Sequence, residues 1–156
     1  MNFKEMIEKV ESSNEFKEWK TTHENFYLAH FFMMAEEGTG WQLGYSDGDK
    51  VATFHVDTLE LVPEQEVYKK PESKISALNL DNLTLEYDEV KKIFDETIQK
   101  EYSKELLFKT IVLVQNTEED LYNITGLTRT FKTLNVKINM KGEVISHNLN
   151  ELVSKG

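Results

Sequence analysis

The histidines are the residues of this chain with the widest chemistry, and their spacing decides what they can do. The four are His23, His30, His55 and His147. None belongs to a His-x-His or His-Glu-x-x-His pattern, the spacings that bring two imidazoles to one metal ion. His30 and His55 could approach each other across adjacent strands, but two histidines alone do not hold a metal. We therefore expect hydrogen-bonded surface histidines, with no metal site and no cofactor.

Other motifs give no catalytic group. Paired carboxylates at 36–37 and 118–120 lie in expected turns, where they are solvated rather than set up as a glycosidase pair. The Asp-Gly-Asp segment at 47–49 lacks the rest of a calcium loop, and Gly-Thr-Gly at 38–40 lacks the Gly-Lys-Ser/Thr continuation of a phosphate loop. There is no Gly-x-Ser-x-Gly elbow and no cysteine. The sequence predicts a protein that is not an enzyme.

Charge and composition exclude further classes. The 156 residues carry a net charge of −10, and no Lys/Arg cluster stands clear of acidic neighbours. Nucleic acids and anionic membranes are therefore not expected partners. The first 13 residues are charged and amphipathic, unlike a signal peptide. The longest apolar run, 26–35, is far shorter than the roughly 20 residues that span a bilayer. We expect a cytoplasmic protein.

Hydrophobic periodicity predicts the elements that position these residues. Apolar residues at i, i+3, i+4 and i+7 predict a helix over 3–10, and a capping box at 12–15 predicts a short second helix. A third helix is expected over 86–102. Apolar and alternating runs between turn signals predict strands. The expected strands cover 26–36, 41–45, 50–57, 59–67, 106–116, 121–128, 132–140 and a segment that begins at 143.

The order of these elements repeats. Trp41 matches Tyr122 and Phe54 matches Val136, each with an offset of about 82 residues. The sequence predicts an α+β fold of two tandem helix–antiparallel-meander repeats. In each repeat a helix precedes three or four strands, and the helices pack on one sheet face. The expected repeats are 1–70 and 86–156, which can form one compact domain, with a linker and a short strand at 71–85.

The second half ends in a strand, an Asn, a short Gly turn and Glu-Val-Ile, over residues 132–147. This ending resembles the close of a PepSY module. The first half is similar through 41–45 and 53–57, and departs after Asp57, where Thr-Leu-Glu-Leu replaces the Gly turn. The resemblance implies a helix packed across an antiparallel sheet. The tandem arrangement is similar to β-lactamase-inhibitor proteins and to uncharacterised archaeal proteins. PepSY proteins are usually exported, whereas this chain is expected to stay in the cytoplasm.

Strand alternation separates a core face from an open face. Leu134, Val136 and Ile138 point toward the helices, so Asn135 and Lys137 point away. The strand at 26–36 is apolar on both faces, with Leu28, His30, Phe32 and Met34 expected on the open one. Something must cover that face, either this chain, a second copy or a partner. The candidate binding residues are His30, Phe32, Met34, Thr53, His55, Asn123, Asn135 and Lys137.

Three functions fit these observations. The first is a non-enzymatic binding or regulatory module that contacts an unknown protein, or itself, through the open face. The second is a small-ligand carrier or undetected enzyme with a helix–sheet pocket lined by Tyr27, Trp41, Tyr45 or Tyr122. The third is an acidic mimic of nucleic acid that binds a basic protein, with carboxylates spaced along one face.

Overall fold

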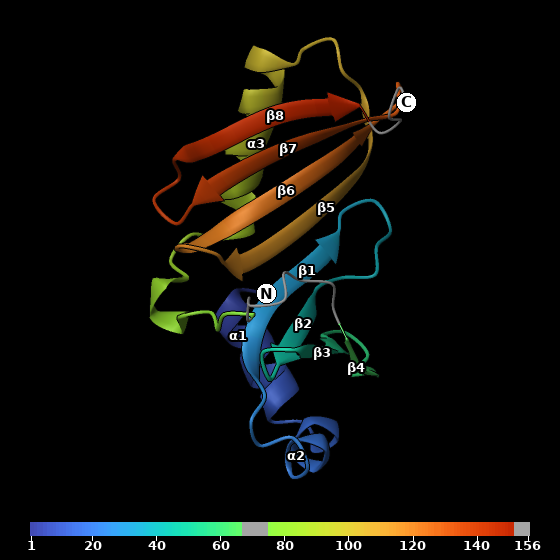
Figure 1. Cartoon of the computed structure of the whole chain (residues 1–156), viewed down its shortest axis with the longest axis vertical. Coiled ribbons are helices and arrows are strands. Elements are labelled where there is room, and N and C mark those ends of the chain that lie inside the picture. The colour runs from blue at the N-terminus through green and yellow to red at the C-terminus, as the bar shows by residue number, and fades with distance from the viewer. Residues whose placement is uncertain (67–74, 152–156) are drawn as a thin grey trace.

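A computed structural model of the chain describes residues 1–66 and 75–151 (Figure 1). The first half contains α1 (Phe3–Glu11), α2 (Asn14–Lys20), β1 (Tyr27–Met34), β2 (Gln42–Ser46), β3 (Lys50–His55) and β4 (Leu61–Glu66). The second half contains the 3-10 turn η1 (Leu80–Asn82), α3 (Tyr87–Glu101), β5 (Leu107–Asn116), β6 (Asp120–Thr128), β7 (Lys132–Asn139) and β8 (Val144–Glu151). The predicted helices and the eight longer strands are therefore present.

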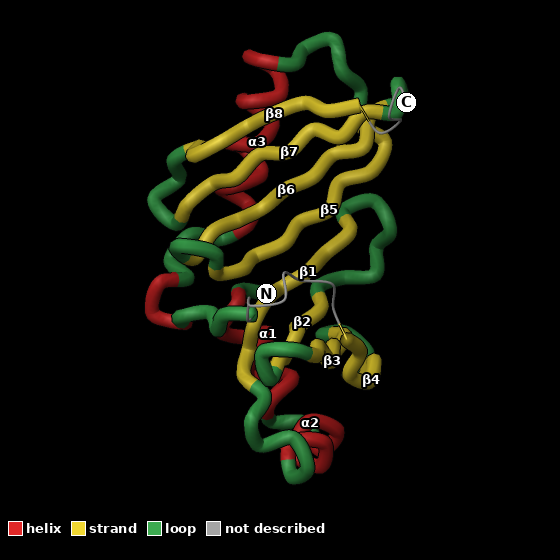
Figure 2. The backbone as a smooth tube through the Cα atoms, viewed as in Figure 1, coloured by secondary structure: helices red, strands yellow, loops and turns green. Residues whose placement is uncertain are grey.

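All eight strands form one sheet in the order β4-β3-β2-β1-β5-β6-β7-β8 (Figure 2). Every neighbouring pair is antiparallel. This confirms the α+β class with an antiparallel sheet. Of the segment 71–85, where a linker and a short strand are expected, the described residues 75–85 hold η1 and no strand. The segment 75–78 instead runs beside β1, where Leu78 N–H donates to the Leu28 carbonyl at 3.0 Å. Residues 67–74, with the expected boundary at 70, lie outside the described residues.

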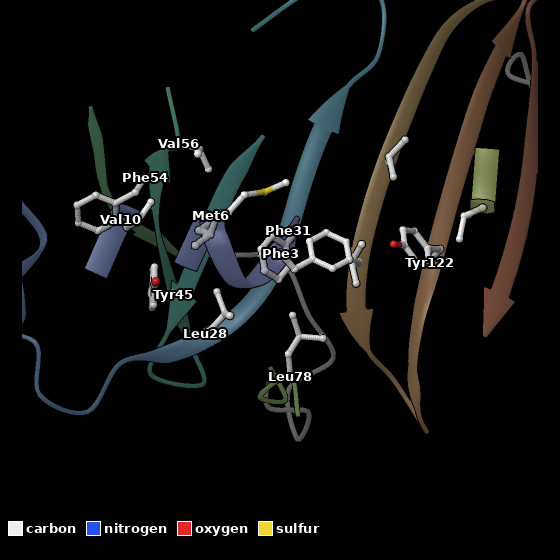
Figure 3. Packing of buried hydrophobic residues seen from close by; sticks show 14 of the residues in the cluster. Phe3, Met6, Val10, Leu28, Phe31, Tyr45, Phe54, Val56, Leu78 and Tyr122 are labelled. Carbon is white, nitrogen blue, oxygen red and sulfur yellow. The ribbon is translucent and has the colours of Figure 1, made fainter. Parts of the chain in front are cut away.

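The core lies between one face of the sheet and the helices. A row of cross-strand partners, all fully buried, crosses six strands and consists of Phe54, Leu43, Phe31, Val114, Tyr122 and Ile138. On α1, Phe3 packs between the two halves, with its ring 4.4 Å from Phe31 and 6.1 Å from Tyr122 (Figure 3). Burying each such side chain contributes about 1.5–3 kcal/mol. This row holds the two halves in one core.

Local signals set the helix starts. Asn2 caps α1 in a capping box with Glu5, which the amphipathic pattern did not identify. The cap of α2 is Ser13, whose hydroxyl accepts from Phe16 N–H at 3.1 Å, one residue later than the predicted box began. The two helices therefore begin where side-chain oxygens satisfy free N–H groups.

One predicted orientation in β1 is wrong, because the strand contains a bulge. Leu28 pairs with Tyr45 and His30 pairs with Gly44, so Ala29 is an extra residue without an opposite partner. The shift places Leu28 on the helix face, where it is 9% exposed and belongs to the core. From His30 onward the predicted alternation holds.

The His30–Gly44 pair gives a test of this register. A Cβ atom added to Gly44 would lie 2.1 Å from Cε1 of the His30 ring. We expect Gly44→Ala to destabilise the protein by about 1–3 kcal/mol, because the ring must move. In the double variant with His30→Ala the clash is absent. The double variant should therefore lose less stability than the sum of the losses in the two single variants. Urea unfolding of all four species measures this coupling, and strictly additive costs would contradict the placement of the ring.

Candidate functional site

The sheet face opposite the helices, called the open face here, carries no helix in the part of the chain that the structure describes (Figure 1). Strand pairing places the eight candidate residues on it, and all of them are half-buried. One cross-strand row runs through His55, Gln42, Phe32, Leu113, Asn123 and Lys137. Their position on one surface is settled by the pairing, while their role in binding stays a prediction.

The middle of the open face is apolar. Phe32 on β1 pairs with Leu113 on β5, and Met34 pairs with Ile111. These four residues, called the central patch here, are all half-buried. The candidate list included only the two from β1. The two-faced apolar pattern of residues 111–114 signalled the other two, but only the β1–β5 pairing shows that they join the same patch.

One flank of the central patch is a rigid polar network. Asn135 Nδ2 donates to Asn123 Oδ1 at 2.6 Å and to Thr125 Oγ1 at 3.0 Å. The three side chains come from β6 and β7, so they tie these strands together across the open face. Because Asn135 holds the other two side chains by hydrogen bonds, this flank presents a preorganised surface.

His30 lies on β1, two residues before Phe32, at one end of the open face. The segment that begins at Ile75 approaches it, and a cavity of about 260 Å³ lies between them. Tyr27 Oη donates to the Ile75 carbonyl, which anchors this segment to β1. Burial lowers the pKa of His30 to about 4, so the ring is neutral at pH 7. The chain therefore approaches this end of the face itself, while no helix or strand among the described residues lies over the central patch.

The predicted approach of His30 and His55 is wrong. β2 lies between β1 and β3, so the two residues are on strands that are two spacings apart, roughly 9–10 Å. They are also offset along the strands, because His30 is level with Thr53 rather than with His55. Among the described residues, no three His, Cys, Asp or Glu side chains form a group that could hold a metal ion.

Two of the three tyrosines predicted to line a helix–sheet pocket lie in the core, while Tyr27 is half-buried beside Ile75. Tyr45 and Tyr122 are at most 2% exposed. Tyr45 Oη donates to Glu11 Oε2 at 2.9 Å, and Tyr122 Oη donates to the Leu85 carbonyl at 2.6 Å. Trp41 differs, because it lines a cleft of about 400 Å³ on the helix side. Only this tryptophan, of the predicted pocket residues on the helix side, borders an open space.

Comparison with known proteins finds a similar fold but no similar sequence. No known family matches the sequence, and no curated protein matches it. The crystal structure of a "putative lipoprotein" from Clostridium difficile 630 is similar, with a TM-score of 0.55 and 9% sequence identity. The likeness covers 86% of this chain and 89% of that chain. At this identity it shows a shared fold alone.

The helices described in the structure include none that is both long enough and apolar enough to cross a membrane.

The buried His30 predicts an acid-sensitive stability. Its pKa is about 4 in the folded state and near 6.5 when unfolded, so the unfolded chain binds the extra proton between these values. The stability is fully present above pH 6.5 and falls toward pH 4, by up to about 3 kcal/mol. We expect His30→Phe to remove this part of the loss in urea titrations at pH 7 and pH 4.5. The matched control is His55→Phe on the same face, and an equal effect there would contradict the assignment.

Proposed function

We propose that this chain is a non-enzymatic binding module that recognises a protein through its open face. The observation that carries the proposal is the central patch in the middle of a sheet face whose flanks are polar. In the part of the chain that the structure describes, no helix or strand lies over this patch. An apolar centre within a polar rim is the usual anatomy of a protein-recognition surface. Both strands of the patch are paired on both sides, so its side chains are held rigidly before any partner arrives.

We also infer that the two halves are tandem PepSY-like repeats. Residues matched by the sequence offset support this, because they are cross-strand partners in both halves. Leu43 pairs with Phe54, and their counterparts Ile124 and Val136 pair with each other. The order of the sheet is also the one expected when two four-strand meanders join through their first strands.

The same offset supports a local two-fold axis through the central patch. Phe32 and Leu113 are counterparts under the offset, and they pair with each other. The pairs on either side, Phe31–Val114 and Met33–Val112, exchange under the same operation. A partner on this face would therefore meet two flanks of similar geometry.

The two flanks differ in their side chains. Gln42 and His55 on the first half correspond to Asn123 and Lys137 on the second. A single partner in one orientation can use such a difference, because only one flank carries the lysine charge at neutral pH. The expected cytoplasmic location stays a prediction.

The central patch gives the main test. We expect Phe32→Ala with Met34→Ala to abolish a complex that the wild type forms, because these substitutions remove the apolar centre of the face. Affinity capture from the native cell detects a foreign partner, and sedimentation equilibrium detects self-association. The matched control is Lys92→Ala with Glu96→Ala, which changes two exposed residues of α3 on the opposite side. Circular dichroism checks that each variant is folded.

A crosslinking measurement decides the outcome independently of affinity. A photoreactive residue at Gln42, on the open face, is compared with one at Glu96 on α3. Specific crosslinks from Gln42 alone agree with the proposal. A monomeric wild type that yields the same products from both positions contradicts it.

A further inference from the structure

A cleft of about 400 Å³ opens on the helix side of the molecule, where the N-termini of α1 and α3 meet. The two helices touch there, because Phe3 N–H donates to Glu86 Oε1 at 3.3 Å. Six of the residues that line the cleft carry its chemistry: Phe3, Trp41, Asp57, Glu86, Tyr87 and Asp88. This site lies on the opposite side of the sheet from the open face.

One wall of the cleft is aromatic. The Trp41 ring stands nearly perpendicular to Phe3 and to Tyr87, with centroids 5.6 and 5.7 Å apart and interplanar angles of 82° in both cases. Trp41 and Tyr87 are half-buried, so part of each ring remains accessible from the cleft. The face of an aromatic ring carries partial negative charge, and it attracts cations within about 6 Å.

The cleft is lined by charged groups of both signs. Two helix N-termini contribute about half a positive charge each, roughly +1 together. The carboxylates of Asp57, Glu86 and Asp88 outweigh them with three negative charges. Lys9 lies nearby, where its Nζ donates to the Asp57 carbonyl at 3.2 Å, and compensates only part of the difference. Met1 also lines the cleft, and its α-amino group offsets the remaining charge. The preference for a cation therefore rests on the aromatic faces and on the two exposed carboxylates beside them, Asp57 and Asp88.

The loop before β2 lies close to one of these carboxylates. Gly40 has a φ of +75°, which few L residues adopt, and an added Cβ would lie 2.5 Å from Asp57 Oδ2. The glycine therefore allows the Asp57 carboxylate to lie directly against the loop beside Trp41. The Gly-Thr-Gly turn, which is not a phosphate loop, positions an acidic group instead.

We propose that this cleft binds a small organic cation that carries an alkylammonium group. The charged nitrogen lies near Asp57 and Asp88, and its methyl or methylene groups rest against Trp41 and Tyr87. The volume falls within the roughly 300–1,000 Å³ of small-molecule sites. A neutral ligand of the same shape would desolvate the carboxylates without pairing them, so it is disfavoured. This site is additional to the proposed protein-binding face.

The test compares choline with 3,3-dimethyl-1-butanol, its neutral isostere, in which carbon replaces the charged nitrogen. Each gives a nine-proton methyl singlet, so ligand-observed NMR titration measures both in the same way. We expect choline to bind at least about tenfold more tightly, and added salt to weaken it. Equal affinities, or no choline binding at tens of millimolar, would overturn the proposal.

Variants distinguish choline binding in the cleft from non-specific attraction of choline to an acidic protein. We expect Asp57→Asn to weaken choline binding about fivefold or more, and Trp41→Leu to do the same by removing the ring face. The control is Glu96→Gln, an equal charge change about 12 Å along α3 from Asp88. An equal loss in that control would overturn the site. If Trp41→Leu does not fold, Asp57→Asn carries the test.

The double variant of Phe32 and Met34 distinguishes the two proposals. It removes the central patch on the opposite side of the sheet, so its choline affinity should equal that of the wild type. A loss of choline binding in that folded variant would place the ligand outside the cleft and overturn the assignment.

Discussion

The antiparallel pairing of β1 with β5 is the contact on which the rest of this structure depends. It is the ladder that joins the two four-strand halves of the sheet. Both strands are apolar on both faces, and either one left at a sheet edge would present apolar side chains and free backbone groups together. Their pairing removes both edges at once. It also aligns Phe31 with Val114, which completes the buried row across the sheet.

β4 remains at one edge of the sheet. β4 carries Pro63 and the acidic residues Glu64 and Glu66, which discourage further strand pairing. Glu64 is also engaged, because its Oε1 lies 2.8 Å from Nε2 of His23, which stacks on Trp19. The Glu64–His23 contact therefore links the edge strand β4 to the residues that follow α2.

The central pairing also accounts for where both proposed sites lie. On the helix side it brings the N-termini of α1 and α3 together, and with them an aromatic wall and three carboxylates. On the other side it joins Phe32 to Leu113 in the middle of the open face. The two sites differ in chemistry, since one is a cleft lined by carboxylates and aromatic rings and the other is a half-buried apolar patch. Their positions share one cause, which is the meeting of the two halves.

The sequence by itself determined the elements and most of their faces. Helix and strand periodicities are local, and they predicted that Leu134, Val136 and Ile138 would be buried while Asn135 and Lys137 would not. Tertiary structure decided what depends on which strands pair. The bulge at Ala29 turned Leu28 inward, and β2 separated His30 from His55. Leu113 entered the central patch, and Trp41, Tyr87 and Asp57 met in one cleft, only because segments far apart in the chain pack together. No local pattern encodes such contacts, because they arise from hydrogen bonding and packing between strands and helices rather than within them.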